Sequence, residues 1–261
     1  MSSIVTDQGI VHYETVGRGR PVVLLHCWLG SWSYWLSTME YLSDAYKTYA
    51  LDFWGFGESA KQGSFTVDEY VTMVAQFMER LGLRETPIMG HSMGGSVTLS
   101  LALRHPQRVT KLAIVGSPVV GDGLAFPLKL AGNRRIAWLL YKFPQLFASG
   151  VKLASPFYAQ DWRAWYEMFI EDLSQTTMES FSVSIRDLRQ IDLRPRLHEL
   201  DMPTMGIFGQ KDNIVDPNQG EILREGAPHP LIHYFSQSAH FPMLDETDHF
   251  HRAIRNFLDQ V

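Results

Sequence analysis

Short apolar segments alternate with longer segments of helical periodicity along most of this chain, and this alternation limits the possible folds more than any other feature. Helical spacing of apolar residues is clear at 67–81 and 97–105. Turn residues flank the short apolar segments, which lie at 21–26, 48–52, 87–90, 112–116 and 205–209. Strands that are separated by helices pair in parallel through right-handed crossovers. The pattern therefore predicts an α/β fold with a mostly parallel central sheet that is flanked by helices.

The alternation stops between residues 119 and 200, where helical segments follow one another without a convincing strand. Residues 119–160 hold five basic side chains and one acidic side chain, and residues 119–170 hold eleven of the 32 aromatic residues. Strand periodicity then resumes at Met205. We expect residues 1–118 and 201–261 to form a core domain and residues 119–200 to form a helical insertion in it.

The composition excludes several classes of protein. A chain of 261 residues suffices for one large domain or for a domain that carries an insertion. Its net charge of −5 provides no positive field for nucleic acid, and its single cysteine cannot form an internal disulfide. No apolar run approaches the roughly 20 residues of a transmembrane helix, and the N-terminus lacks the pattern of a signal peptide. We expect a cytoplasmic protein; nothing in the sequence indicates its oligomeric state.

The segment Gly90-His91-Ser92-Met93-Gly94 places a serine between a predicted strand and a predicted helix. In this Gly-x-Ser-x-Gly pattern, small residues allow a sharp turn and the serine hydroxyl projects above the sheet. The helix that follows directs its free N–H groups and its positive dipole end at the site. Ser92 is the predicted nucleophile, and the alternative is that it only caps the helix.

A serine nucleophile needs a histidine as base and an acid that orients this histidine. Reacting groups of parallel sheets lie at the carboxyl ends of the strands. Among ten histidines, His240 is favoured because it follows the short apolar segment 231–235. Asp212 is favoured as the acid because it follows the predicted strand that begins at Met205, and Asp122 is the main competitor.

Acyl transfer also needs N–H donors where negative charge develops on the substrate. The backbone N–H of Met93, directly after the nucleophile, is one candidate. The second is expected in the loop after the predicted strand at 21–26, at the backbone N–H of Trp28.

The aromatic residues of the insertion favour an apolar substrate pocket. We expect the side chains of His26, Trp138, Phe143 and Phe241 to contact the substrate. The basic excess favours an anionic or interfacial lipid substrate and a weak contact of the insertion with a lipid interface. The alternative, in which the aromatic residues form the insertion's own core and the basic residues its solvated surface, stays open.

These residues resemble the α/β-hydrolase-fold serine hydrolases, a superfamily of esterases, lipases and C–C hydrolases, along the whole chain outside the insertion. The landmarks are Leu24-Leu25-His26, Asp52-Phe53-Trp54-Gly55-Phe56-Gly57-Glu58-Ser59, and the segments 90–95, 209–212 and 240–242. The resemblance implies Ser92 as nucleophile, Asp212 as acid, His240 as base, and Trp28 and Met93 as oxyanion donors. It also implies that the insertion is a helical cap over the site. Cys27 departs from the family, which usually has glycine there.

The resemblance implies a hydrolase that needs no cofactor and has no metal site. The expected function is that of a carboxylesterase, which cleaves an apolar ester through an acyl-enzyme. A carbon–carbon bond hydrolase of diketone-like ring-cleavage products is the alternative, and a low-turnover ligand receptor is a remoter one. Serine at the nucleophile position argues against the haloalkane dehalogenase and epoxide hydrolase branches, which place an aspartate there.

Overall fold

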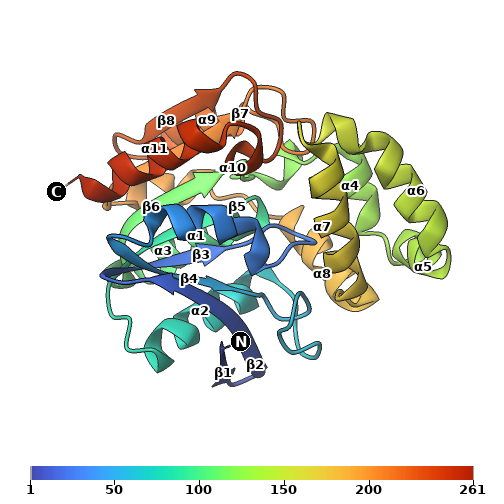
Figure 1. Cartoon of the computed structure of the whole chain (residues 1–261), viewed down its shortest axis with the longest axis horizontal. Coiled ribbons are helices and arrows are strands. Elements are labelled where there is room, and N and C mark those ends of the chain that lie inside the picture. The colour runs from blue at the N-terminus through green and yellow to red at the C-terminus, as the bar shows by residue number, and fades with distance from the viewer. Residues whose placement is uncertain (1, 261) are drawn as a thin grey trace.

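Residues 2–260 are described in a computed structural model, and their strands form one sheet in the order β1-β2-β4-β3-β5-β6-β7-β8 (Figure 1). Pairing is antiparallel between β1 and β2 and between β2 and β4, and it is parallel in the rest of the sheet. This confirms the predicted fold class. The strands are β1 (Ser2–Thr6), β2 (Gly9–Gly17), β3 (Arg20–Leu25), β4 (Tyr46–Leu51), β5 (Thr86–His91), β6 (Val109–Val115), β7 (Thr204–Gly209) and β8 (Leu231–Phe235).

The middle strands are apolar along their length because helices cover both faces of the sheet. In β3, for example, residues 22–25 are fully buried. The helices of the core are α1 (Leu36–Leu42), α2 (Val67–Arg80), α3 (Met93–Arg104), α9 (Gln219–Gly226), α10 (Pro242–Asp245) and α11 (Thr247–Asp259). Helices α1 and α11 lie on one face, and α2, α3 and α9 lie on the other (Figure 1).

Local sequence explains where two core helices begin. Helix α2 begins after Thr66, whose side chain accepts a hydrogen bond from the backbone N–H of Glu69. Asp68 and Glu69 also place negative charge in its first turn. Helix α3 begins earlier than the helix predicted at 97–105, because Gly94 and Gly95 have no side chains that could show helical periodicity.

Strands β1 and β2 fall outside the sequence-based prediction. They form an antiparallel hairpin at the edge of the sheet, and the residues of β1 alternate between partly buried and exposed along most of its length. A half-exposed strand of five residues lacks the continuous apolar run that marks the middle strands.

Five helices lie between β6 and β7 and form a cap beside the carboxyl ends of the strands (Figure 1). They are α4 (Phe126–Ala131), α5 (Arg134–Lys142), α6 (Pro144–Ala154), α7 (Trp162–Ser174) and α8 (Met178–Leu188). The two ends of this insertion meet, since Gly121 N donates to Ile191 O at 2.8 Å and Leu193 N donates to Val119 O at 3.1 Å. The domain boundaries at 118/119 and 200/201 stay a prediction. No helix within residues 2–260 combines the length and apolar character needed to cross a bilayer.

Candidate active site

Ser92 lies in the turn between β5 and α3, with φ of +52° and ψ of −117°. Such left-handed backbone costs a residue other than glycine about 1–3 kcal/mol and persists only where the surroundings enforce it. A Cβ on Gly90 would lie 2.1 Å from the carbonyl oxygen of Gly94, and a Cβ on Gly94 would lie 2.5 Å from that of His26. Only glycine therefore permits the sharp turn that sets Ser92 at the N-terminus of α3.

His240 and Asp212 form a buried pair, in which His240 Nδ1 lies 2.7 Å from Asp212 Oδ2. The other carboxylate oxygen, Oδ1, accepts backbone hydrogen bonds from Ile214 at 2.8 Å and from Val215 at 3.0 Å. These bonds fix the carboxylate as an acceptor for the Nδ1–H of His240. In the neutral imidazole, Nε2 then carries the lone pair that can accept a proton.

His91, which precedes Ser92, supports the backbone of His240. Its Nε2 lies 2.8 Å from the His240 carbonyl oxygen. Burial, and after it the neighbouring His240, lowers the pKa of His91 well below its ordinary value of 6.5, so a neutral ring donates this hydrogen bond. From the cap, the carbonyl oxygen of Tyr158 accepts the backbone N–H of His240 at 3.3 Å. Both the core and the cap therefore hold His240 in place.

Ser92 and His240 line a cavity of about 310 Å³ that also has walls from the cap helices. The remaining lining side chains are apolar or aromatic, apart from the thiol of Cys27, and none of the described lining residues is Asp, Glu, Lys or Arg. A charged ligand would lack a partner in these surroundings, and an unpaired buried charge is costly. The cavity therefore favours a neutral, apolar ligand.

The loop after β3 forms one wall of the cavity and is held from two sides. On the core side, fully buried His26 accepts a hydrogen bond from Phe53 N at 2.9 Å through Nε2, and its Nδ1 donates to the Cys27 carbonyl at 2.6 Å. Burial lowers the pKa of His26, so its ring is neutral. On the cap side, the indole N–H of Trp28 donates to the carbonyl oxygen of Phe181 in α8 at 3.1 Å.

Cys27 packs inside this loop as a small side chain. Burial raises the pKa of its thiol far above the ordinary value, so the thiol stays protonated. A Cβ on Gly30 would lie 2.7 Å from Cys27 Sγ, and Leu29 has a φ of +54°. The loop is therefore folded tightly around the thiol at the position where the family usually has glycine.

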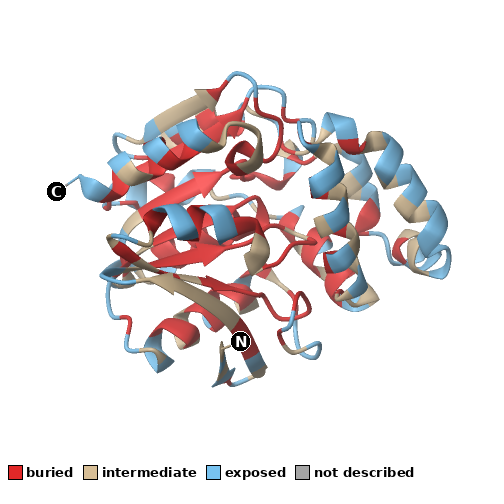
Figure 2. Ribbon diagram, in the orientation of Figure 1, coloured by how far each residue is buried: buried red, intermediate tan, exposed pale blue. Residues whose placement is uncertain are grey.

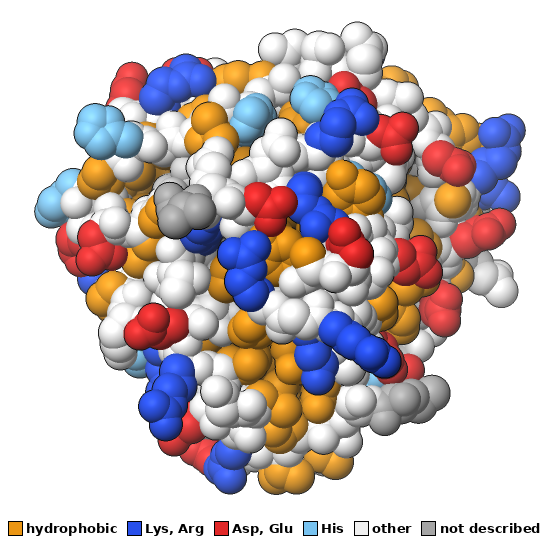
Figure 3. Space-filling model, turned by 60° about the vertical axis from the view of Figure 1, so that its left-hand side comes forward, with side chains coloured by type: hydrophobic (Ala, Val, Ile, Leu, Met, Phe, Trp, Pro, Cys, Tyr) orange, Lys and Arg blue, Asp and Glu red, His pale blue; other side chains and the backbone are white. Residues whose placement is uncertain are grey.

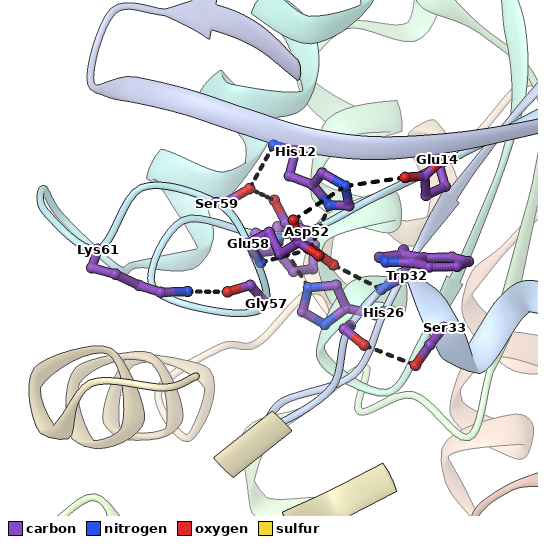
Figure 4. A network of polar contacts seen from close by, with 12 residues as sticks. His12, Glu14, His26, Trp32, Ser33, Asp52, Gly57, Glu58, Ser59 and Lys61 are labelled. Carbon is purple, nitrogen blue, oxygen red and sulfur yellow. Dashed lines mark hydrogen bonds and ion pairs between the residues drawn. The ribbon is translucent and has the colours of Figure 1, made fainter. Parts of the chain in front are cut away.

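Asp52 anchors a buried polar network beside this loop (Figure 4). Its Oδ1 accepts from Trp32 N at 2.7 Å, and its Oδ2 accepts from Glu58 N at 2.9 Å and lies 2.9 Å from His12 Nδ1. A Cβ on Gly57 would lie 2.2 Å from Asp52 Oδ2, so the close approach of the carboxylate requires glycine there. Segment 52–59, one of the landmarks shared with the family, therefore has a structural role: through Asp52 it fixes the backbone at Trp32, beyond the loop.

The structure separates the predicted substrate contacts. Phe241 lines the cavity, whereas His26 lies buried behind the wall. Trp28, predicted as an oxyanion donor through its backbone, also lines the cavity. Trp138 and Phe143 are about half exposed and are not among the lining residues. The predicted contacts do not include the lining side chains of α4 and α6, among them Leu128, Phe147 and Val151. Helix α6 is apolar on more than one side, so its periodicity does not indicate which of its residues face the cavity.

The other predicted residues have clear positions. Of the two acids, Asp212 contacts His240, and Asp122 is exposed in the turn η3 (Gly121–Gly123). Met93 begins α3, so its backbone N–H lies at the helix N-terminus directly after Ser92. Within residues 2–260, no group of three or more His, Cys, Asp or Glu side chains is placed to hold a metal ion.

Comparisons with known proteins find relatives along almost the whole chain. The chain is 27% identical to a pimeloyl-[acyl-carrier protein] methyl ester esterase of Aliivibrio fischeri, over 96% of this chain and 98% of the relative. It is 26% identical to a 2-hydroxy-6-oxo-6-phenylhexa-2,4-dienoate hydrolase of Comamonas testosteroni, over 96% of this chain and 92% of the relative. A crystal structure of a hydrolase from Pseudomonas aeruginosa PA01 superposes with a TM-score of 0.87 at 21% identity, over 99% of this chain and 98% of that chain.

These relatives confirm the prediction of a hydrolase and of an esterase or C–C hydrolase class. The family model for the alpha/beta hydrolase fold matches residues 20–247, which include Ser92, Asp212 and His240. Because this match covers most of the chain, the chain belongs to the alpha/beta hydrolase fold family.

Proposed function

We propose that the protein is a serine carboxylesterase that cleaves an uncharged, apolar ester. One observation carries the proposal: Ser92, on a strained turn, lines the same apolar cavity as His240, whose Nδ1 lies 2.7 Å from Asp212. These side chains have the three roles that activate a serine, namely nucleophile, base and orienting acid. The relatives that are ester hydrolases support the same reaction class.

The reaction proceeds through an acyl-enzyme. His240 Nε2 takes the proton of Ser92 while Oγ bonds to the carbonyl carbon of the ester, and the backbone N–H groups of Met93 and Trp28 stabilise the oxyanion. The intermediate collapses when the C–O bond to the alcohol breaks and His240 gives its proton to the leaving oxygen. His240 then takes a proton from a water molecule whose oxygen bonds to the acyl carbon. The acid leaves when the bond from this carbon to Ser92 Oγ breaks and His240 returns the proton to Oγ. Asp212 stays ionised throughout and holds the imidazole tautomer.

The cavity favours ester hydrolysis over the carbon–carbon alternative. Dienoate substrates, such as the one for which the Comamonas testosteroni relative is named, carry a carboxylate. Among the described residues that line the cavity, none is Lys or Arg, so such a carboxylate would lie in apolar surroundings without a partner. An aliphatic acyl chain would instead be surrounded by apolar side chains over its whole length.

Three further features belong to this proposal. Residues 119–200 act as the cap that sets substrate size. The substrate is lipid-like, and any contact with a lipid interface is made through the cap. The enzyme works in the cytoplasm, because its single cysteine is buried and the fold needs no disulfide.

Hydrolysis of p-nitrophenyl esters with two to about twelve acyl carbons tests the proposal. Ser92→Ala should lower kcat about 10⁴–10⁶-fold, whereas Ser100→Ala, a control on the same helix outside the cavity, should leave it unchanged. A fluorophosphonate should label Ser92 in the wild type. Esterase activity that survives in Ser92→Ala would show that Ser92 is not the nucleophile. A higher kcat/KM on a dienoate than on every ester would establish the carbon–carbon hydrolase instead, and ligand binding without turnover would favour a receptor.

A further inference from the structure

The outer surface of the cap exposes an unusual number of large apolar side chains. Eight of the thirteen large apolar side chains that are exposed among the described residues lie between 126 and 157. Leu146 and Leu153 are 74% and 82% exposed. We use the term cap face for the exposed apolar side chains of α5, α6 and the short turn after α6, which are Trp138, Leu139, Phe143, Leu146, Leu153 and Phe157.

Helical spacing collects these side chains into stripes. Phe143, Leu146, Leu153 and Phe157 follow one another at intervals of three, seven and four residues, which places them on one side of α6 and its extension. Phe147 and Val151, which line the cavity, lie roughly 100° and 140° around the helix axis from Leu146. A helix that is apolar over so wide an arc is normally buried over all of it, yet Figure 2 shows the outer side of α5 and α6 as largely exposed.

The charge of this region opposes the charge of the rest of the protein. Residues 123–160 hold five basic side chains and no acidic one, so they carry +5 in a chain whose net charge is −5. The remaining residues therefore carry −10. On the side of the molecule around the C-terminus, by contrast, basic and acidic side chains are interspersed (Figure 3).

The basic groups are interleaved with the apolar ones. On α5, residues 135, 138, 139 and 142 share one side of the helix and are Arg, Trp, Leu and Lys. Lys142 Nζ lies 4.5 Å from the centre of the Trp138 ring and 5.9 Å from that of Phe143. Basic side chains that pack on the aromatic side chains of an amphipathic helix are typical of helices at a membrane interface.

We propose that the cap face docks on an anionic bilayer and that a lipid-like ester passes from the bilayer into the cavity beside α4; this inference rests on the proposed esterase function. Leu130 of α4 marks the route, since it lines the cavity and is also 41% exposed. Apolar side chains of the cap face enter the boundary between headgroups and acyl chains, and Arg134, Arg135, Lys142 and Lys152 contact anionic headgroups. A bilayer suits this surface better than a protein partner, because the apolar side chains protrude, Leu146 and Leu153 being 74% and 82% exposed, and basic side chains lie among them.

Binding of the full-length Ser92→Ala protein to vesicles tests the inference without consuming lipid. The vesicles are phosphatidylcholine alone, or phosphatidylcholine with 30% phosphatidylglycerol, and the measured quantity is the partition coefficient from co-sedimentation. We expect binding to the anionic vesicles that is at least about tenfold tighter than to neutral ones and that weakens with salt. Equal partitioning into both kinds of vesicle, or none into either, would overturn the docking.

A matched pair of double variants locates the contact. Leu146→Glu with Leu153→Glu should lower the partition coefficient at least about tenfold, because it places two charges where the apolar side chains would enter the bilayer. Val5→Glu with Ile10→Glu makes the same charge change at exposed positions of β1 and β2 and should change it less than twofold. Equal losses in the two pairs would contradict the cap face as the contact.

Two outcomes separate this inference from the proposed function. The Leu146→Glu, Leu153→Glu protein should still hydrolyse short soluble esters at the wild-type rate, since neither residue lines the cavity. Loss of vesicle binding with this activity intact supports the docking. Binding of the cap face to an acidic acyl carrier protein, without binding to anionic vesicles, would replace the bilayer by a protein partner. A protein that binds vesicles but hydrolyses no ester would refute the proposed function alone.

Discussion

Replacing Asp172 with Asn should make the protein more stable relative to the wild type as the pH rises. Asp172 lies on α7 with 4% of its surface exposed, and its Oδ2 has no hydrogen-bond partner among the described residues. Burial raises the pKa of this carboxyl from 3.8 to about 7, while the nearby hydroxyls of Ser31 and Tyr34 act in the opposite direction. At higher pH, the wild-type protein must therefore ionise a carboxyl whose charged form is disfavoured by the protein interior.

The sign and size of the effect follow from the two pKa values. Between pH 3.8 and about 7, the folded state retains a proton that the unfolded state has lost, so the free energy of unfolding falls as the pH rises. A difference of about three pKa units corresponds to about 4 kcal/mol. Asn carries no charge at any of these pH values, so the variant avoids this loss.

Urea unfolding of both proteins at pH 4.5 and pH 8.5 measures the effect, because contributions of the other titrating groups cancel in the difference. The free energy of unfolding of Asp172→Asn, relative to the wild type, should increase by about 3–4 kcal/mol from the lower to the higher pH. Asp201→Asn, at an exposed position, should show no such increase. A difference between Asp172→Asn and the wild type that is the same at both pH values would refute the reasoning.

Three other substitutions have defined outcomes. Trp28→Phe removes the hydrogen bond to the Phe181 carbonyl and should lower kcat about tenfold or more, with a smaller change in KM, because it loosens a loop proposed to hold an oxyanion donor; equal changes in both constants would contradict this. Phe147→Ala enlarges the cavity and should shift the optimum of kcat/KM to longer acyl chains in the p-nitrophenyl series, where each added methylene is worth about 0.8 kcal/mol; an unchanged optimum would count against it. Burial disfavours the charged form of His12, but the hydrogen bond and charge of Asp52, with other carboxylates, raise the pKa of His12 above 6.5. His12→Gln should therefore lower the free energy of unfolding more at pH 5.5 than at pH 8.5, since the contribution of His12 is lost as the pH rises through the folded-state pKa, and denaturation at the two pH values checks this.

The sequence predicted the elements whose surroundings are uniform. Strands that are buried on both faces are continuous apolar runs, so β3 and β7 could be placed from sequence alone. The edge hairpin of β1 and β2 is half exposed and gave no such run. The Gly-x-Ser-x-Gly pattern led to Ser92. The strand-end rule led to Asp212 and His240, because it depends on topology and not on side-chain packing.

The residues around the substrate could not be predicted in the same way. Helix α6 is apolar on two sides, so its periodicity does not reveal that Phe147 faces the cavity and Leu146 faces outward. Trp138 was expected at the substrate because it belongs to the aromatic-rich insertion, yet it lies on the outer side of α5. Asp172 illustrates the same difficulty, since only tertiary packing buries this carboxyl against Ser31 and Tyr34.

The contacts between cap and core indicate which part of the cap can admit substrate. The Trp28 indole donates to Phe181 in α8, the backbone N–H of His240 donates to Tyr158 just before α7, and Gln160 N donates to Asp245 at 2.7 Å. A movement of α7 and α8 away from the core would break these bonds and displace the groups that position His240 and the loop after β3. Passage beside α4, past the half-exposed Leu130, leaves all of them in place. Entry from the side of the cap face is therefore compatible with an active site that stays assembled while substrate binds.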